Sequence, residues 1–121
     1  MSDFVFAINA DEISAGEAVM VKIGDKFYAI CNDDGIFYAV DESCPHEGGH
    51  LSRGLVQDGC LVCPVHLWAW NLRTGKNSAG RPHLLLNTYP CQFRDGKVYV
   101  DVSGPIKPDE GMNFAGLGEE S

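Results

Sequence analysis

Long apolar runs are missing from this sequence. No stretch approaches the roughly 20 consecutive apolar residues that cross a bilayer. The first residues, Met1-Ser2-Asp3-Phe4, lack the basic start and the apolar stretch of a signal peptide. These absences argue against a membrane protein and a secreted one, and we expect a soluble, cytoplasmic protein.

Positive charge is also scarce. The chain has 9 Lys and Arg against 17 Asp and Glu, which gives a formal net charge of −8. A protein this acidic is not expected to bind nucleic acid, because both surfaces would repel each other. The charge either steers the protein toward a basic partner surface or serves solubility alone.

Helical periodicity and internal repeats are missing as well. At 121 residues the chain is long enough for one domain, which we place at residues 1–102, followed by a tail rich in Gly, Pro and acidic residues at 103–121. Short apolar runs alternate with turn signals, of which Asp95-Gly96 is the clearest for a type I′ hairpin. This pattern predicts an all-β antiparallel fold, a sandwich or small barrel. The expected strands are 4–8, 17–23, 26–31, 36–40, 55–56, 60–62, 68–72, 89–94 and 97–102.

Cysteine is present in an odd number, five. Cys31, Cys60 and Cys91 lie in apolar runs and are expected to be small buried side chains. Cys60-x-x-Cys63 also matches a redox dithiol. No alternation of strands and helices surrounds it, and Cys63 has a better use as a metal ligand.

Two Cys–His pairs dominate the middle of the chain. Cys44-Pro45-His46 and Cys63-Pro64-Val65-His66 are separated by sixteen residues, and Pro and Gly around them predict two loops. Thiolate and imidazole bind zinc, copper and iron–sulfur clusters. Zinc fingers place two Cys before two His on a helix. The order Cys, His, Cys, His without a helix favours a [2Fe–2S] cluster, and zinc remains the alternative.

These motifs resemble the Rieske family. Cys-Pro-His-Glu-Gly-Gly-His-Leu, Cys-Pro-Val-His-Leu-Trp and the later Leu-Arg-Thr-Gly are similar to a soluble Rieske-type ferredoxin over about residues 4–102. The resemblance implies a Rieske-type fold with a two-loop cluster-binding subdomain, about residues 43–85. It implies that Cys44 and Cys63 bind one iron and that His46 and His66 bind the other. Further residues expected near the cluster are Gly48, Gly49, Leu67, Trp68 and Pro82, the last in a third loop that covers the cluster in the family.

The resemblance also implies a function. A Rieske ferredoxin is not an enzyme but a one-electron carrier, here between a flavin-dependent reductase and a terminal oxygenase. The alternatives are the small subunit of an assimilatory nitrite reductase, in which the ligands are often lost, and a zinc-stabilised module without a redox role.

The neighbours of the ligands predict a low reduction potential. High-potential members of the family join the two loops by a disulfide, and Gly49 and Val65 stand at those positions here. They also donate hydrogen bonds from a Ser and a Tyr, whose positions Trp68 and Trp70 occupy without a hydroxyl. We therefore expect a potential nearer about −150 mV than about +300 mV. Backbone N–H groups would then supply most hydrogen bonds to sulfur, with Gly48 and Gly49 allowing a close approach.

Three other residues near the motifs carry expectations. Leu67 stands where most low-potential relatives have Gly, and the His-Leu-Trp run is similar to ferredoxins of toluene-type monooxygenases. Leu67 is expected to shield the cluster or contact a partner, or simply to pack. Glu42 and Glu47 are expected to be solvated charges, with guidance of docking as the alternative.

Overall fold

The computed structural model describes residues 4–46, 48–64, 67–103 and 105. Its strands are short and two single 3₁₀ turns interrupt them, so the all-β prediction is confirmed. The elements are β1 Phe4–Asn9, η1 Ala10–Glu12, β2 Ala18–Ile23, β3 Lys26–Asp33, β4 Ile36–Asp41, η2 Leu51–Arg53, β5 Leu55–Gln57, β6 Cys60–Val62, β7 Ala69–Asn71, β8 Thr88–Tyr89, β9 Cys91–Arg94 and β10 Lys97–Asp101. Among the described residues, no helix is long and apolar enough to cross a membrane.

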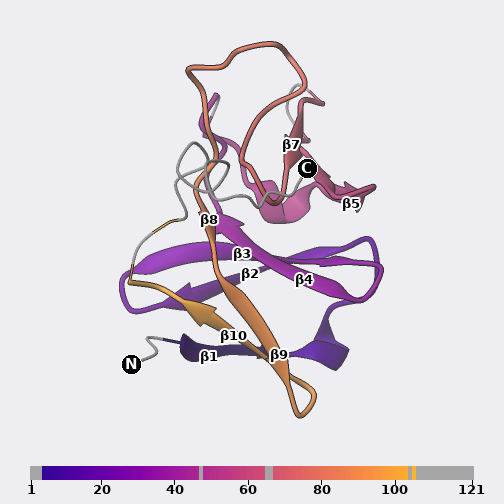
Figure 1. The fold of residues 1–121 in the computed structure, drawn as a ribbon, viewed down its shortest axis with the longest axis vertical. Helices are drawn as coiled ribbons and strands as arrows, with labels where there is room; N and C mark the ends of the chain where they lie inside the picture. The colour runs from indigo at the N-terminus through magenta and orange to yellow at the C-terminus, as the bar shows by residue number, and fades with distance from the viewer. Residues whose placement is uncertain (1–3, 47, 65–66, 104, 106–121) are drawn as a thin grey trace, which may run out of the picture.

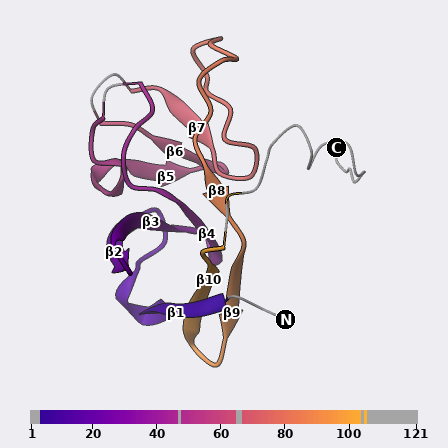
Figure 2. The ribbon, with the colours of Figure 1, turned by 90° about the vertical axis from the view of Figure 1, so that its left-hand side faces the viewer.

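The described residues form three antiparallel sheets. Their strand orders are β1-β10-β9, β2-β3-β4-β8 and β5-β6-β7. The first two form the base of the molecule, and the third lies at one end, beside the loops that carry the Cys–His motifs (Figures 1 and 2). This arrangement agrees with the predicted cluster-binding subdomain on a β framework.

Asp-Gly pairs turn the chain at three hairpins. At Asp95-Gly96 both residues have positive φ, 53° and 75°, as the predicted type I′ turn requires. Asp34-Gly35 and Asp58-Gly59 have the same pattern of positive φ. The turns fix the register of the three strand pairs: Asp33 lies opposite Ile36, Gln57 opposite Cys60 and Arg94 opposite Lys97.

Strands β3 and β4 are buried on both faces, and this separates two cores. Alternate residues of a strand point to opposite faces. Ala29 and Cys31 of β3 pack in a core shared with the β5-β6-β7 sheet, whereas Tyr28 and Ile30 pack in a core shared with β1 and β10. The central sheet therefore supports the Cys–His loops from below while its other face stabilises the base.

The single strand expected at 89–94 is divided in two, which corrects that part of the prediction. Pro90 interrupts it, because proline has no N–H for a ladder hydrogen bond. Before Pro90, β8 pairs with β4, and after it, β9 pairs with β10. Pro90 therefore marks the point where the chain passes from one sheet to the other.

The tail predicted at 103–121 lies outside the described residues, apart from Ser103 and Pro105. The division of the chain at about residue 102 stays a prediction.

Candidate iron–sulfur site

The first ligand loop is closed by two backbone hydrogen bonds, and Cys44 takes part in both, as the donor of one and the acceptor of the other. The Cys44 N–H donates to the carbonyl of Gly49 at 2.9 Å, and the Gly48 N–H donates to the carbonyl of Cys44 at 2.7 Å. The loop begins after β4, and a bridge between Ser43 and His50 narrows its neck. The cysteine is thus fixed at the start of a tight turn.

The second ligand loop has the same hydrogen bonds. The Cys63 N–H donates to the carbonyl of Trp68 at 2.8 Å, and the Leu67 N–H donates to the carbonyl of Cys63 at 2.9 Å. In both loops the cysteine is the first residue, the fifth residue donates back to it, and the sixth accepts its N–H. The two halves of the site are therefore built on one repeated backbone frame.

The fifth residue of each frame has positive φ. It is 72° at Gly48 and 61° at Leu67. Glycine adopts this conformation freely, whereas leucine is strained there. The family's glycine at the position of Leu67 is explained by this geometry. The Leu67 side chain is 72% exposed, so it lies on the surface and not in the core.

Both predicted cysteine ligands are buried in the same part of the core. Cys44 is 3% exposed and Cys63 is 1% exposed, and both belong to the same packed core. Two buried thiols that begin matching loops fit the cysteine-bound half of a [2Fe–2S] cluster.

The histidine half is described in part. His46 is partly exposed, whereas His66, with Val65 and Glu47, lies outside the described residues. No three His, Cys, Asp or Glu side chains gather as ligands of one metal ion in the described ranges, which hold only three of the four predicted ligands. The assignment of Cys44, His46, Cys63 and His66 as ligands stays a prediction.

Two tryptophans extend from the second loop. The Trp68 ring stacks on the His46 imidazole, with 3.9 Å between ring centroids and 11° between planes. Trp70 is fully buried, and its ring centroid lies 6.0 Å from that of Trp68. Trp68 therefore contacts a predicted ligand, and Trp70 lies next to it in the core.

Glu42 corrects an expectation. It is 6% exposed and not a solvated charge. Its carboxylate accepts hydrogen bonds from the Ser52 N–H at 3.1 Å and the Ser52 hydroxyl at 2.8 Å, and it lies 3.2 Å from Nδ1 of His50. Its carbonyl accepts the Leu51 N–H. Glu42 thus joins the two ends of the first ligand loop, a role that nothing in the local sequence pattern indicates.

The third loop is organised by one side chain. The Asn77 amide donates to the carbonyls of Arg81 and Leu84 and accepts the N–H groups of Ala79 and Arg81. Leu84 packs on the core that holds both cysteines. Pro82 is exposed, and its predicted contact with the cluster stays a prediction.

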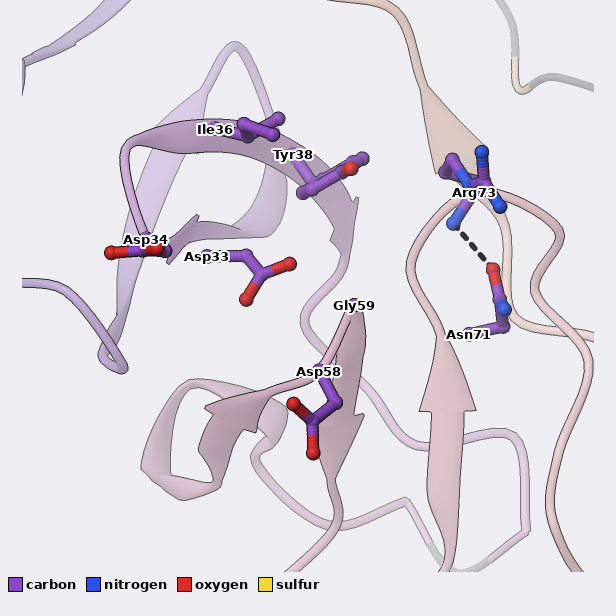
Figure 3. Close-up of a pocket in the computed structure, with 8 residues that line it drawn as sticks. All are labelled: Asp33, Asp34, Ile36, Tyr38, Asp58, Gly59, Asn71 and Arg73. Carbon is purple, nitrogen blue, oxygen red and sulfur yellow. Dashed lines mark hydrogen bonds between the residues drawn. The ribbon is translucent and has the colours of Figure 1, made fainter.

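A pocket opens at the far end of the β5-β6-β7 sheet (Figure 3). It lies beside the Asp58-Gly59 turn, at the opposite end of β6 from Cys63. Arg73 donates its N–H to the Asn71 side chain at 2.9 Å, at one edge of the pocket. The residues lining the pocket are Asp33, Asp34, Ile36, Tyr38, Asp58, Gly59, Asn71 and Arg73. This pocket is separate from the predicted ligands.

The three other cysteines are structural. Cys31 is fully buried, and burial raises the pKa of its thiol. Burial also raises the pKa of Cys60, and that of Cys91 to about 12. Thiols with raised pKa are poor nucleophiles at neutral pH. The expectation of small buried side chains is confirmed for Cys31, whereas Cys60 and Cys91 are only partly buried.

The fold and the paired loops define a class of protein, an all-β carrier of a cluster held by cysteine and histidine. The chain belongs to the Rieske [2Fe–2S] domain family, whose model matches residues 3–90. Its cofactor is the Rieske-type cluster with two Cys and two His ligands, and the protein is an electron-transfer component and not an enzyme. Family membership favours iron–sulfur over zinc.

Known relatives narrow this class. The chain is 37% identical to the biphenyl dioxygenase ferredoxin subunit of Pseudomonas sp. strain KKS102, over 83% of this chain and 93% of the relative. The solved Sphingomonas yanoikuyae B1 ferredoxin is 26% identical with a TM-score of 0.73, over 81% of this chain and 97% of that one. A putative NADH-dependent nitrite reductase small subunit from Mycobacterium tuberculosis is also 26% identical with a TM-score of 0.73, over 83% and 95%. The chain is thus similar both to ferredoxins and to a nitrite reductase small subunit, the two kinds of protein predicted from the sequence. The relative with the higher identity, 37%, is a ferredoxin subunit.

Proposed function

We propose that this ferredoxin carries single electrons from a flavin-dependent reductase to a terminal oxygenase. The observation that supports this most is the repeated loop frame, which presents Cys44 and Cys63 at matching positions. In this proposal Cys44 and Cys63 hold one iron, and His46 and His66 hold the other. The bound cluster supplies reversible one-electron chemistry.

The chain's own residues divide the site into a buried side and an exposed side. Cys44 and Cys63 are withdrawn from water into the core, which limits access to the sulfur atoms. His46 in the first loop is partly exposed, and Leu67 in the second loop is exposed. Electron transfer needs a short path to the partner, so we place the contact for both partners at this exposed side.

The cytoplasmic location expected from the sequence belongs to the same proposal. Cell fractionation with an antibody to the chain tests it, and recovery in the membrane fraction would contradict it.

A reconstitution assay tests the electron-carrier proposal. The purified protein replaces the ferredoxin subunit in the biphenyl dioxygenase system of Pseudomonas sp. strain KKS102, with its reductase and terminal component present. We expect reductase-dependent reduction of this protein and product formation above the ferredoxin-free background. Cys63→Ser should abolish both, whereas Cys60→Ser, three residues earlier, should retain them.

The nitrite reductase alternative has its own outcome. The likeness to the Mycobacterium tuberculosis small subunit supports it. If the protein is not reduced by any flavin reductase of the dioxygenase type but co-purifies with a large nitrite-reducing subunit, the oxygenase proposal is wrong.

A further inference from the structure

The indole N–H of Trp70 is a buried donor that has no partner among the described residues. Trp70 is 0% exposed, and its Nε1 has no hydrogen-bond partner within the described part of the chain. An indole nitrogen can donate a hydrogen bond but cannot accept one, so only an acceptor atom can pair with it. Leaving a buried donor unpaired is costly, and each case calls for an explanation.

The surroundings of Trp70 indicate what kind of acceptor its indole N–H could reach. Trp70 packs in the same core as Cys44 and Cys63. Trp68 directly precedes β7 and lies two residues before Trp70, and the two ring centroids are 6.0 Å apart, so both rings lie on the same side of the chain. The Trp68 ring stacks on His46. Trp70 thus lies on the cluster side of the sheet, behind the residue that contacts a predicted ligand.

Cluster sulfur supplies an acceptor of the right kind. Thiolate and sulfide carry negative charge and accept N–H hydrogen bonds, and such bonds help to set the potential of iron–sulfur sites. The rest of this core is lined by apolar side chains, among them Leu51, Leu61 and Leu72. An apolar surrounding gives a water molecule few polar partners.

We propose that Trp70 Nε1–H donates a hydrogen bond to a sulfur at the cysteine-bound side of the cluster and thereby raises its reduction potential. This rests on the proposed function. Reduction adds one negative charge, so a donor stabilises the reduced state more than the oxidised state. The expectation that Trp70 provides no donor, which follows from its missing hydroxyl, is revised: the ring replaces O–H with N–H.

Potentials of three proteins test the proposal. In Trp70→Phe the ring remains and the donor is lost, and we expect the equilibrium constant for reduction to fall about tenfold, which is about 59 mV for one electron. Thr88→Val is the matched control, because Thr88 Oγ1 is the other buried polar atom without a partner among the described residues. It should leave the potential unchanged. Equal potentials in the wild type and Trp70→Phe, or equal shifts in both variants, would overturn the proposal.

A second measurement needs no substitution at Trp70. In the reduced wild-type protein with ¹⁵N-labelled indole, pulsed EPR should detect a nitrogen coupling that persists in Trp68→Phe. Absence of any indole coupling, with the cluster signal intact, would overturn the role of Trp70 and leave the electron-carrier proposal standing. Absence of the cluster signal itself would overturn both.

Discussion

The left-handed fifth residue of the two ligand loops decides how each loop tolerates substitution. Gly48 meets no steric obstacle there, since a Cβ would lie 4.0 Å from the Ser43 hydroxyl oxygen. Leu67 adopts the same conformation at the strain cost of a non-glycine residue. Because its side chain is mostly exposed, packing does not offset that cost, which favours a role for Leu67 in partner contact.

Substitutions at Leu67 and Gly48 distinguish the effect of backbone strain on stability from the effect of the Leu67 side chain on partner binding. Leu67→Gly should raise the apparent Tm by a few degrees, since relief of roughly 1–2 kcal/mol of strain exceeds the added backbone entropy. The same variant should raise the KM of the terminal oxygenase for the reduced carrier. Gly48→Ala introduces a non-glycine residue at the same positive φ in the first loop and should lower the Tm. Thermal scans and steady-state kinetics check this, and a Leu67→Gly protein with lower Tm would show that the strain argument is wrong.

Glu42 is the residue whose loss should loosen the first ligand loop. Glu42→Gln retains the size of the side chain but replaces one accepting oxygen with a donor, so contacts to Ser52 or His50 are lost. Charge-assisted hydrogen bonds contribute about 1.5–3 kcal/mol, so we expect a Tm lower by roughly 5–10 °C and faster loss of the cluster absorbance. Asp58→Asn, at the far end of β6, is the control and should behave as the wild type. If both variants lose the cluster absorbance at the same rate, Glu42 does not hold the first ligand loop together.

At the scale of elements, a polar network connects three strands of the base. Tyr89 of β8 donates to Asp41 of β4 at 2.6 Å, and Lys26 of β3 lies 3.0 Å from the same carboxylate. Burial and the hydrogen bond to Asp41 raise the pKa of Tyr89 to about 12, against a smaller lowering effect of Lys26. Burial lowers the pKa of Lys26, but its hydrogen bonds to Tyr89 and Asp41 outweigh this and raise it. The network fastens β8 to the sheet that supports the ligand loops.

Alkaline pH should weaken this network in a defined window. The pKa of folded Tyr89 is above the unfolded value of about 10, so its contribution to stability is complete below about pH 10 and is lost as pH rises through about 12. We expect the wild type to lose roughly 1 kcal/mol more than Tyr89→Phe over that window. Thermal scans at pH 8 to 12 measure this. Tyr99→Phe, on β10 outside the network, should follow the wild type; if Tyr89→Phe does so too, the network does not contribute.

The sequence predicts the elements well where local chemistry determines them. The Asp-Gly turns require positive φ, so the hairpins and the strands beside them follow directly. The division at Pro90 was not predicted, because the pairing of β8 with β4 and of β9 with β10 depends on distant strands. Glu42 was misjudged for the same reason: its partners lie eight and ten residues away and are brought together only by the loop. The family motif identifies Cys44 and Cys63, but their shared backbone frame is visible only in the structure.

At the scale of the whole molecule, the excess of negative charge should change the rate at which the protein associates with its partners. Residues 1–102 carry 13 acidic and 8 basic residues, a balance of −5, and the rest of the chain adds −3. Charges of one sign raise association rates with an oppositely charged surface and are screened by salt.

Ionic strength therefore provides a test of charge steering. We expect the second-order rate of reduction by the partner reductase to fall roughly tenfold between about 0.01 and 0.15 M salt. Stopped-flow kinetics measures this rate, and the potential should stay constant over the same range. A rate independent of salt would mean that the acidic surface serves solubility alone.

An EPR-monitored redox titration of the purified protein tests the central claim most directly, namely that paired Cys–His loops hold a one-electron Rieske cluster. We predict a signal of the mixed cysteine–histidine type that appears on one-electron reduction, with a midpoint near the low end of the Rieske range, about −150 mV. A midpoint near about +300 mV would contradict the interpretation of Gly49, Val65 and Trp68. No EPR signal together with bound zinc would contradict the electron-carrier account itself.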